Sequence, residues 1–140
     1  MTDVLTGSCL CGQVRFEVTE PPVSASYCHC TRCQKRTGTA ASPQARIVPG
    51  SLRITVGEDL VRAYVPPDGF PKAFCSGCGS ALWSVNPQTN EIASVRMSAF
   101  DDDPGVRPSY RQFVAYAADW EQIPDDGLPR YPEGIPPQPS

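Results

Sequence analysis

Residues 74–79 read Phe-Cys-Ser-Gly-Cys-Gly and carry the strongest local signal in the chain. Cys75 and Cys78 have the spacing of paired ligands in zinc sites, and the glycines let the backbone curl around the two sulfurs. Cys9-Leu-Cys11 offers a second pair, because alternate residues of an extended chain point to one side. One ion bound by both pairs would clamp the beginning of the chain to its middle.

A third cluster reads Cys28-His-Cys-Thr-Arg-Cys33. Its three cysteines, Cys28, Cys30 and Cys33, lie within six residues and can converge on one ion. A site closed by four cysteines is structural, whereas a site with three protein ligands keeps a position open for water or substrate. We therefore expect two zinc ions per chain, one in a structural four-cysteine site and one in a catalytic three-cysteine site.

Other uses of the seven cysteines fit the sequence less well. An odd number leaves one thiol without a disulfide partner, and the spacing does not match the ferredoxin runs of iron–sulfur proteins. His29 could close the second site as a fourth ligand, although it lies between two ligands and should point the other way. Residues 1–10 lack the basic and apolar segments of a secretory signal. We therefore expect a cytoplasmic chain with reduced thiols.

Composition indicates one all-β domain with a thin core. Only 28 of the 140 residues are Leu, Ile, Val or Phe, and 16 Pro and 11 Gly interrupt long helices. Apolar and polar residues alternate as in half-buried antiparallel strands. These expected strands cover residues 13–18, 52–56, 61–65, 81–85, 92–97 and 110–116. Residues 31–36 are expected to form the one short helix, and structural zinc would compensate for the small core.

The composition changes near the C-terminus, where prolines are frequent. We expect a zinc domain over residues 1–125 and an extended or disordered proline-rich tail over residues 126–140. No apolar run is long enough to span a membrane, and a net charge of −3 argues against nucleic acid as a partner. A β-rich chain of this kind can form a homodimer, but no stretch specifies an interface.

The three cysteine clusters resemble those of the glutathione-dependent formaldehyde-activating enzymes, a family that includes centromere protein V. The similar stretches are Gly7-Ser-Cys-Leu-Cys-Gly12, Cys28-His-Cys-Thr-Arg-Cys33 with Thr37-Gly38, Phe74-Cys-Ser-Gly-Cys-Gly-Ser-Ala-Leu82, Asp102-Asp-Pro104, Arg107-Pro108 and Trp120. The resemblance extends from about residue 4 to about residue 125. It implies a β-tent fold of stacked antiparallel sheets, with structural zinc on Cys9, Cys11, Cys75 and Cys78 and catalytic zinc on Cys28, Cys30 and Cys33. The family often carries a His where this chain has Arg111.

Zinc held by three thiolates is a weak Lewis acid, and its soft ligand set favours a sulfur guest. We therefore expect a carbon–sulfur lyase in which a bound, glutathione-like thiol adds to or leaves an aldehyde such as formaldehyde, forming an S-hydroxymethyl thiol. Arg32, Lys35 and Arg36 are candidate anchors for the carboxylates of the thiol, unless they form a solvated helical face. The alternatives are a non-catalytic, zinc-stabilised binding module and a nucleic-acid-binding zinc ribbon.

Several other residues have two interpretations. His29 could shuttle protons or simply pack behind the site. The aromatic residues Phe74, Trp83, Phe113 and Trp120 could line a pocket, although most are expected in the core. Asp101 to Asp103 precede Pro104 and Gly105 and predict a turn.

Overall fold

The computed structural model describes residues 4–136, and within this range ten strands, one α-helix and three short 3-10 helices make up the fold. The expectation of an all-β fold with one short helix is confirmed. In chain order the elements are β1 (Leu5–Ser8), β2 (Arg15–Val18), β3 (Ser24–Cys28), α1 (Thr31–Thr37), β4 (Ser42–Arg46), β5 (Leu52–Val56), η1 (Glu58–Leu60), β6 (Val61–Tyr64), β7 (Lys72–Cys75), β8 (Ala81–Val85), β9 (Ile92–Arg96), η2 (Met97–Ala99), β10 (Pro108–Gln112) and η3 (Val114–Tyr116).

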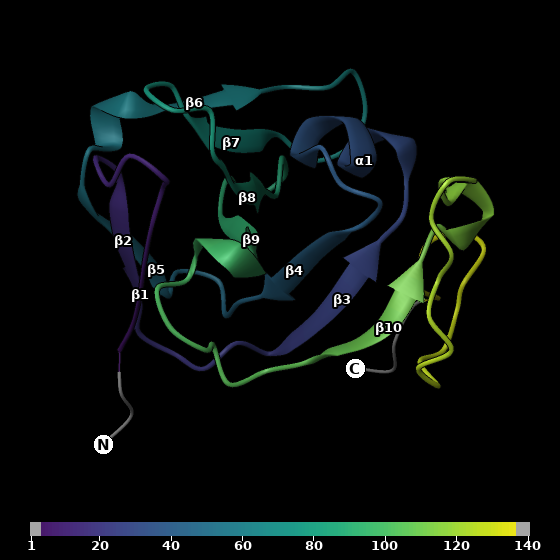
Figure 1. Cartoon of the computed structure of the whole chain (residues 1–140). Coiled ribbons are helices and arrows are strands. Elements are labelled where there is room, and N and C mark those ends of the chain that lie inside the picture. Colours follow the sequence, from purple (N-terminus) through teal and green to yellow (C-terminus); the bar gives the residue numbers. More distant parts are fainter. Residues whose placement is uncertain (1–3, 137–140) are drawn as a thin grey trace.

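The strands form two sheets. The smaller has the order β1-β2-β5, and the larger has the order β10-β3-β4-β9-β8-β7-β6. Figure 1 shows the smaller sheet at one side of the molecule, with β10 and the C-terminal segment at the opposite side. β10 pairs with β3 in parallel, which corrects the expectation of purely antiparallel pairing. Many residues separate these two strands, so no tight hairpin constrains their relative direction.

Four strands were not predicted from the sequence, namely β1, β3, β4 and β7. β3 reads Ser-Ala-Ser-Tyr-Cys and β4 reads Ser-Pro-Gln-Ala-Arg, so small and polar residues hide the period-two pattern. Pro43 is tolerated because it lies at the start of β4, before the register with β9 begins at Gln44. The strand expected at residues 110–116 ends at Gln112, because Phe113 takes a left-handed conformation with φ of 57°.

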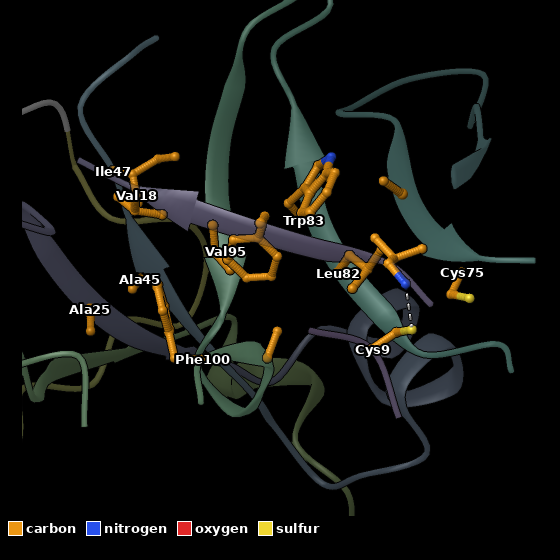
Figure 2. Close-up of a cluster of buried hydrophobic side chains, with 14 residues drawn as sticks. Cys9, Val18, Ala25, Ala45, Ile47, Cys75, Leu82, Trp83, Val95 and Phe100 are labelled. Carbon is orange, nitrogen blue, oxygen red and sulfur yellow. Dashed lines mark hydrogen bonds between the residues drawn. The ribbon is translucent and has the colours of Figure 1, made fainter. Parts of the chain in front are cut away.

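The apolar core lies between the two sheets. Phe16 and Val18 of β2 are buried in it, and Phe16 packs edge-on against Trp83 with the ring centroids 5.5 Å apart. Figure 2 shows Val18 and Trp83 among the buried side chains of this core. Trp83 is buried, as expected for a core aromatic residue. Trp120, in contrast, is 72% exposed, so it is not among the aromatic residues that form the core. It follows η3 in a turn that lies outside the two sheets.

The proline-rich segment lies along β10 as an extended strap over its described residues, up to 136. The Arg111 amide donates to the Pro129 carbonyl at 2.9 Å, and the Tyr131 amide donates to the Arg111 carbonyl at 2.8 Å. The Phe113 amide then donates to the Glu133 carbonyl. Residues 137–140 of the expected tail lie outside the described range, and the domain boundary at residue 125 stays a prediction.

Among the described residues, no helix has the length and apolar character needed to cross a membrane.

Gly57 lies in the turn after β5, and this turn packs closely against the residues before β2. Its φ is 82°, and an added Cβ would lie 2.0 Å from the Gln13 carbonyl oxygen. We expect Gly57→Ala to lower the free energy of unfolding by about 3 kcal/mol, because left-handed strain and a backbone clash add. Gly50 has a similar φ of 81° but open space around its Cα. Gly50→Ala should therefore lower the free energy of unfolding by only about 1 kcal/mol. Urea titration of both variants measures the difference, and equal losses of stability would contradict the clash at Gly57.

Candidate metal centres and the adjoining cavity

The first candidate centre joins two turns that are distant in sequence. Cys9 and Cys11 lie in the turn between β1 and β2, while Cys75 ends β7 and Cys78 lies in the next turn. Their four sulfurs lie within 4.8 Å of one another. The Val14 amide donates to Cys9 Sγ at 3.3 Å, and the Gly79 amide donates to the Cys75 carbonyl at 2.7 Å. Backbone hydrogen bonds thus hold both turns in the shape that brings the sulfurs together.

The spacing of these sulfurs fits a tetrahedral zinc ion. Zinc–sulfur bonds of about 2.3 Å place neighbouring sulfurs about 3.8 Å apart. The Cys9 and Cys11 sulfurs are 3.5 Å apart, and those of Cys11 and Cys75 are 3.9 Å apart. The Ser80 hydroxyl and nearby backbone amides lower the pKa of Cys78 to about 5, which favours the thiolate that zinc requires. Four sulfurs at this spacing leave no position for a substrate.

The second candidate centre is local to one segment. Cys28 ends β3, Cys30 caps the N-terminus of α1, and Cys33 lies in its first turn, with the three sulfurs within 4.8 Å of one another. The Cys33 amide donates to Cys30 Sγ at 3.3 Å. Gly38 ends the helix in a left-handed conformation, so α1 is only seven residues long. The helix therefore extends little beyond what is needed to present Cys33 to the other two cysteines.

The three thiols act as one titrating group. Hydrogen bonds from the Cys28 and Cys33 thiols lower the pKa of Cys30 far below its ordinary value. The same hydrogen bonds raise the pKa of Cys28, whose sulfur is also buried. The centre thus readily holds one thiolate, and a bound cation would favour loss of the remaining protons. Soft, clustered thiolates of this kind suit zinc.

A cavity of about 910 Å³ opens beside this second centre. All three cysteines contribute to its wall, so they face open space. Apolar parts of the wall come from Pro66, Phe70 and Phe113. Volume and lining are typical of small-molecule sites.

Gln44 and Lys72, on the polar face of the larger sheet, line this cavity. Cross-strand register places Gln44 beside Arg96 and Ser84 beside Lys72. The buried Arg96 donates to Gln44 Oε1 and to Ser84 Oγ, and Lys72 Nζ donates to the same hydroxyl at 3.1 Å. Intervening residues of these strands, such as Ala45, point to the core. One set of strands therefore supplies both the core and part of the cavity wall.

The polar face of the larger sheet carries two cations, Lys72 and Arg96. Burial, followed by the charges of Arg96 and Arg36, lowers the pKa of Lys72 to about 8. Burial, followed by the charge of Arg36, lowers the pKa of Arg96 to about 10. Both shifts have the direction expected for cations that repel one another in a poorly hydrated place. This face therefore favours an anion.

The three cations predicted as anchors line the same cavity in different ways. Arg32 is exposed and pairs with Asp68 at 2.6 Å, and Lys35 is also exposed. The guanidinium nitrogens of Arg36 are buried, and within residues 4–136 none has a hydrogen-bond partner. Their role as substrate anchors stays a prediction, but only Arg36 combines burial with free donors.

His29 lies behind the second centre and is absent from its group of sulfurs. It is only 3% exposed, and Arg111 Nη1 donates to its Nε2 at 3.2 Å. Because a guanidinium can only donate, Nε2 must be an acceptor and the ring must be neutral. Burial, followed by the charges of Arg111 and Arg130, lowers the pKa of His29 accordingly. Among its expected roles, the contacts fit packing behind the loop.

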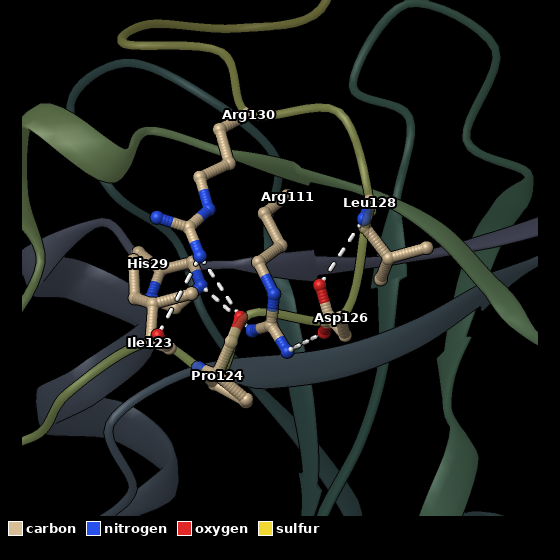
Figure 3. A network of polar contacts seen from close by, with 7 residues as sticks. All are labelled: His29, Arg111, Ile123, Pro124, Asp126, Leu128 and Arg130. Carbon is tan, nitrogen blue, oxygen red and sulfur yellow. Dashed lines mark hydrogen bonds and ion pairs between the residues drawn. The ribbon is translucent and has the colours of Figure 1, made fainter.

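Arg111 is the centre of a network that sequence reasoning missed (Figure 3). Its guanidinium lies 4.3 Å from the centroid of the Tyr27 ring and donates to Asp126 Oδ2 at 2.7 Å. Asp126 belongs to the strap, and its Oδ1 accepts from the Leu128 amide. One side chain therefore joins β10, β3, the loop between the cysteines and the strap.

Lys72, Arg96 and Ser42 were also missed as cavity residues. In sequence, a charged residue at alternate strand positions indicates a solvent-facing side chain. Two positions in the sequence could have indicated them. Arg96 lies in a predicted strand, and Lys72 lies three residues before the metal-ligand candidate Cys75.

Comparisons with known proteins agree with this picture. A family model described as glutathione-dependent formaldehyde-activating enzyme matches residues 4–116. A curated protein from Halomonas elongata is 30% identical over 129 residues, which cover 86% of this chain and 81% of the relative. That relative is named, provisionally, as a glutathione-dependent formaldehyde-activating enzyme.

A solved structure has a similar fold. The crystal structure of a Rhodobacter sphaeroides protein matches with a TM-score of 0.53 and 23% identity. The match covers 90% of this chain and 98% of that one, so the fold is shared across nearly the whole of both.

Separate substitutions should distinguish the two centres. We expect Cys30→Ser to remove one of two zinc ions and keep the fold, because the second centre is local. Cys75→Ser should remove the clamp and unfold the chain, since structural zinc contributes about 10 kcal/mol or more. Zinc per chain by mass spectrometry and far-ultraviolet circular dichroism provide the readouts. Unfolding of Cys30→Ser would instead favour two structural sites and a non-catalytic module.

The Arg111 network can be tested without altering any cysteine. We expect Arg111→Lys to lower the free energy of unfolding by about 2 kcal/mol, because an ammonium cannot contact His29 and Asp126 while stacking on Tyr27. Arg107→Lys is the matched control, since Arg107 is exposed and pairs only near its own turn with Asp103. Chemical denaturation of both zinc-loaded variants gives the comparison. Equal stability of Arg111→Lys and the parent would contradict the network.

Proposed function

Because the chain belongs to the family of glutathione-dependent formaldehyde-activating enzymes, we propose that it is a carbon–sulfur lyase acting on a small thiol and an aldehyde. In one direction a glutathione-like thiol adds to an aldehyde such as formaldehyde and forms an S-hydroxymethyl thiol. In the other direction the adduct separates into its two parts. The observation that carries this proposal is that the three-cysteine centre faces a cavity and is one sulfur short of a tetrahedron, while the other centre already has four sulfurs.

The residues fit zinc at both centres. Cys9, Cys11, Cys75 and Cys78 would hold one ion, and Cys28, Cys30 and Cys33 would hold the other. A zinc ion held by the three cysteines would supply the positive charge that keeps an incoming thiol deprotonated near neutral pH.

The cavity wall supports the carbon–sulfur step. When the thiolate sulfur attacks the carbonyl carbon, a carbon–sulfur bond forms, the carbonyl π bond breaks, and negative charge develops on oxygen. That oxygen then takes up a proton, and the reverse step returns it. Lys72 lines the cavity with the three cysteines, and its ammonium can donate to the developing oxyanion. Apolar wall residues limit water around the reacting carbon.

The cavity also suits the size of the thiol. A volume of about 910 Å³ lies within the range of small-molecule sites and can admit a tripeptide. Arg32 and Lys35 lie on the outer part of the wall, where their exposed charges can attract an acidic thiol.

Exchange spectroscopy tests the proposal. Zinc-loaded protein should broaden the NMR lines of glutathione and its formaldehyde adduct beyond the uncatalysed control, because turnover adds exchange between the two species. Cys30→Ser should abolish the added broadening if it retains its fold and one zinc ion. A parent protein with two zinc ions that adds no exchange would overturn the glutathione–formaldehyde reaction.

A further inference from the structure

Three side chains beside the second centre keep buried donors without partners. The part of the chain that the structure describes has six such atoms, and five of them are the three guanidinium nitrogens of Arg36, the Ser42 hydroxyl and Arg96 Nε. The sixth, Arg111 Nε, belongs to the network around His29. Ser42 is fully buried and Arg96 is 3% exposed. Buried donors are almost always paired in folded proteins, and each unpaired donor costs free energy. A cluster of five such atoms therefore indicates a missing acceptor.

The three residues line one cavity. Its volume is about 580 Å³, and it adjoins the cavity of the three cysteines, since Arg36, Gly79 and Ala81 line both. Ser42 and Gln44 share a face of β4, and Gln44 pairs with Arg96 across the sheet. Arg36 comes from the last turn of α1, three residues after Cys33. Helix and sheet thus direct free donors toward the same space.

The side chains around this cavity carry more positive than negative charge, which favours an anion as the bound group. Asp101 is the acidic residue in its wall, and both of its oxygens already accept from the hydroxyls of Thr6 and Ser8. Among the described residues, neither Arg36 nor Arg96 forms an ion pair, since the four pairs involve Arg32, Arg53, Arg107 and Arg111. Zinc with three thiolates would carry one net negative charge, and with Asp101 this makes two negative charges against the three cations Arg36, Lys72 and Arg96.

We propose that Arg36, Ser42 and Arg96 form a carboxylate-binding site that opens off the cavity of the second centre and holds the carboxylate of a substrate. This inference deepens the proposed function and rests on it. A planar guanidinium with free nitrogens can bind both oxygens of a carboxylate, and the Ser42 hydroxyl adds a third donor. The carboxylate belongs to the thiol, as in glutathione, or to the aldehyde, as in glyoxylate.

Arginine side-chain NMR tests the site on the full-length, zinc-loaded protein. Acetate is the probe, and acetamide is its neutral counterpart. Acetate should shift the Nε–Hε signals of Arg36 and Arg96, while acetamide should not. We expect Arg36→Gln to weaken acetate binding at least about tenfold, because a charged pair of hydrogen bonds is lost. Arg62→Gln is the matched control, since Arg62 is exposed and bonds only to carbonyls of its own turn.

A second variant keeps the test open if Arg36→Gln loses its fold or a zinc ion. Ser42→Ala removes one donor and leaves both guanidinium groups in place, and it should weaken acetate binding by a smaller factor. Equal acetate affinity in the parent and in the folded variants would overturn the site. Shifts caused equally by acetamide would overturn it as well.

Two competitors identify the source of the carboxylate. S-methylglutathione carries the carboxylates of the thiol with its sulfur blocked, and glyoxylate carries the carboxylate of an aldehyde. Displacement of acetate by either one assigns the source, and displacement by neither would overturn a substrate role. The exchange experiment with glutathione and formaldehyde runs in parallel. Acetate binding without exchange defeats the proposed reaction alone, whereas exchange without acetate binding defeats this site alone.

Discussion

The four-sulfur group is the constraint on which the rest of the fold depends. It connects the turn after β1 to the end of β7, so it links the two sheets covalently once an ion is bound. Cys75 of this group and the neighbouring Val14 are both fully buried and belong to the apolar core. The metal centre and the core therefore form one packed unit. Because a domain is stable by only about 5–15 kcal/mol, a metal clamp can compensate for the small number of aliphatic residues.

The clamp also determines how well the second centre is organised. Cys75 ends β7, and Lys72 begins it, so an ion at the first centre fixes the strand that carries part of the cavity wall. The opposite face of the same sheet packs in the core through Ala73, Trp83 and Val95. Side chains on strands that are held from behind occupy defined positions, which binding and catalysis require. The four-cysteine centre thus helps to fix, through the sheet, the strands that line the cavity of the three-cysteine centre.

Spacing within a segment was predictable, whereas contacts between segments were not. Cys30-x-x-Cys33 and the helix between them follow from local geometry, and the pairing of two cysteine turns follows from the ligand count. β3 and β4 could not be predicted, because strands buried by small and polar residues lack alternation. The meeting of His29, Arg111 and Asp126 depends on a parallel strand pair and on the strap, which no local pattern encodes.

The positions of the charged side chains matter more for anion binding in this molecule than the net charge does. The chain has a net charge of −3, and cysteine thiolates make it more negative, so the overall field repels an acidic substrate. Arg36, Lys72 and Arg96 nevertheless gather around two adjoining cavities, where burial weakens screening by water and salt. An anion is therefore stabilised once it enters these cavities beside the three cysteines. These cations also orient an anion that enters, because its charged end must face them.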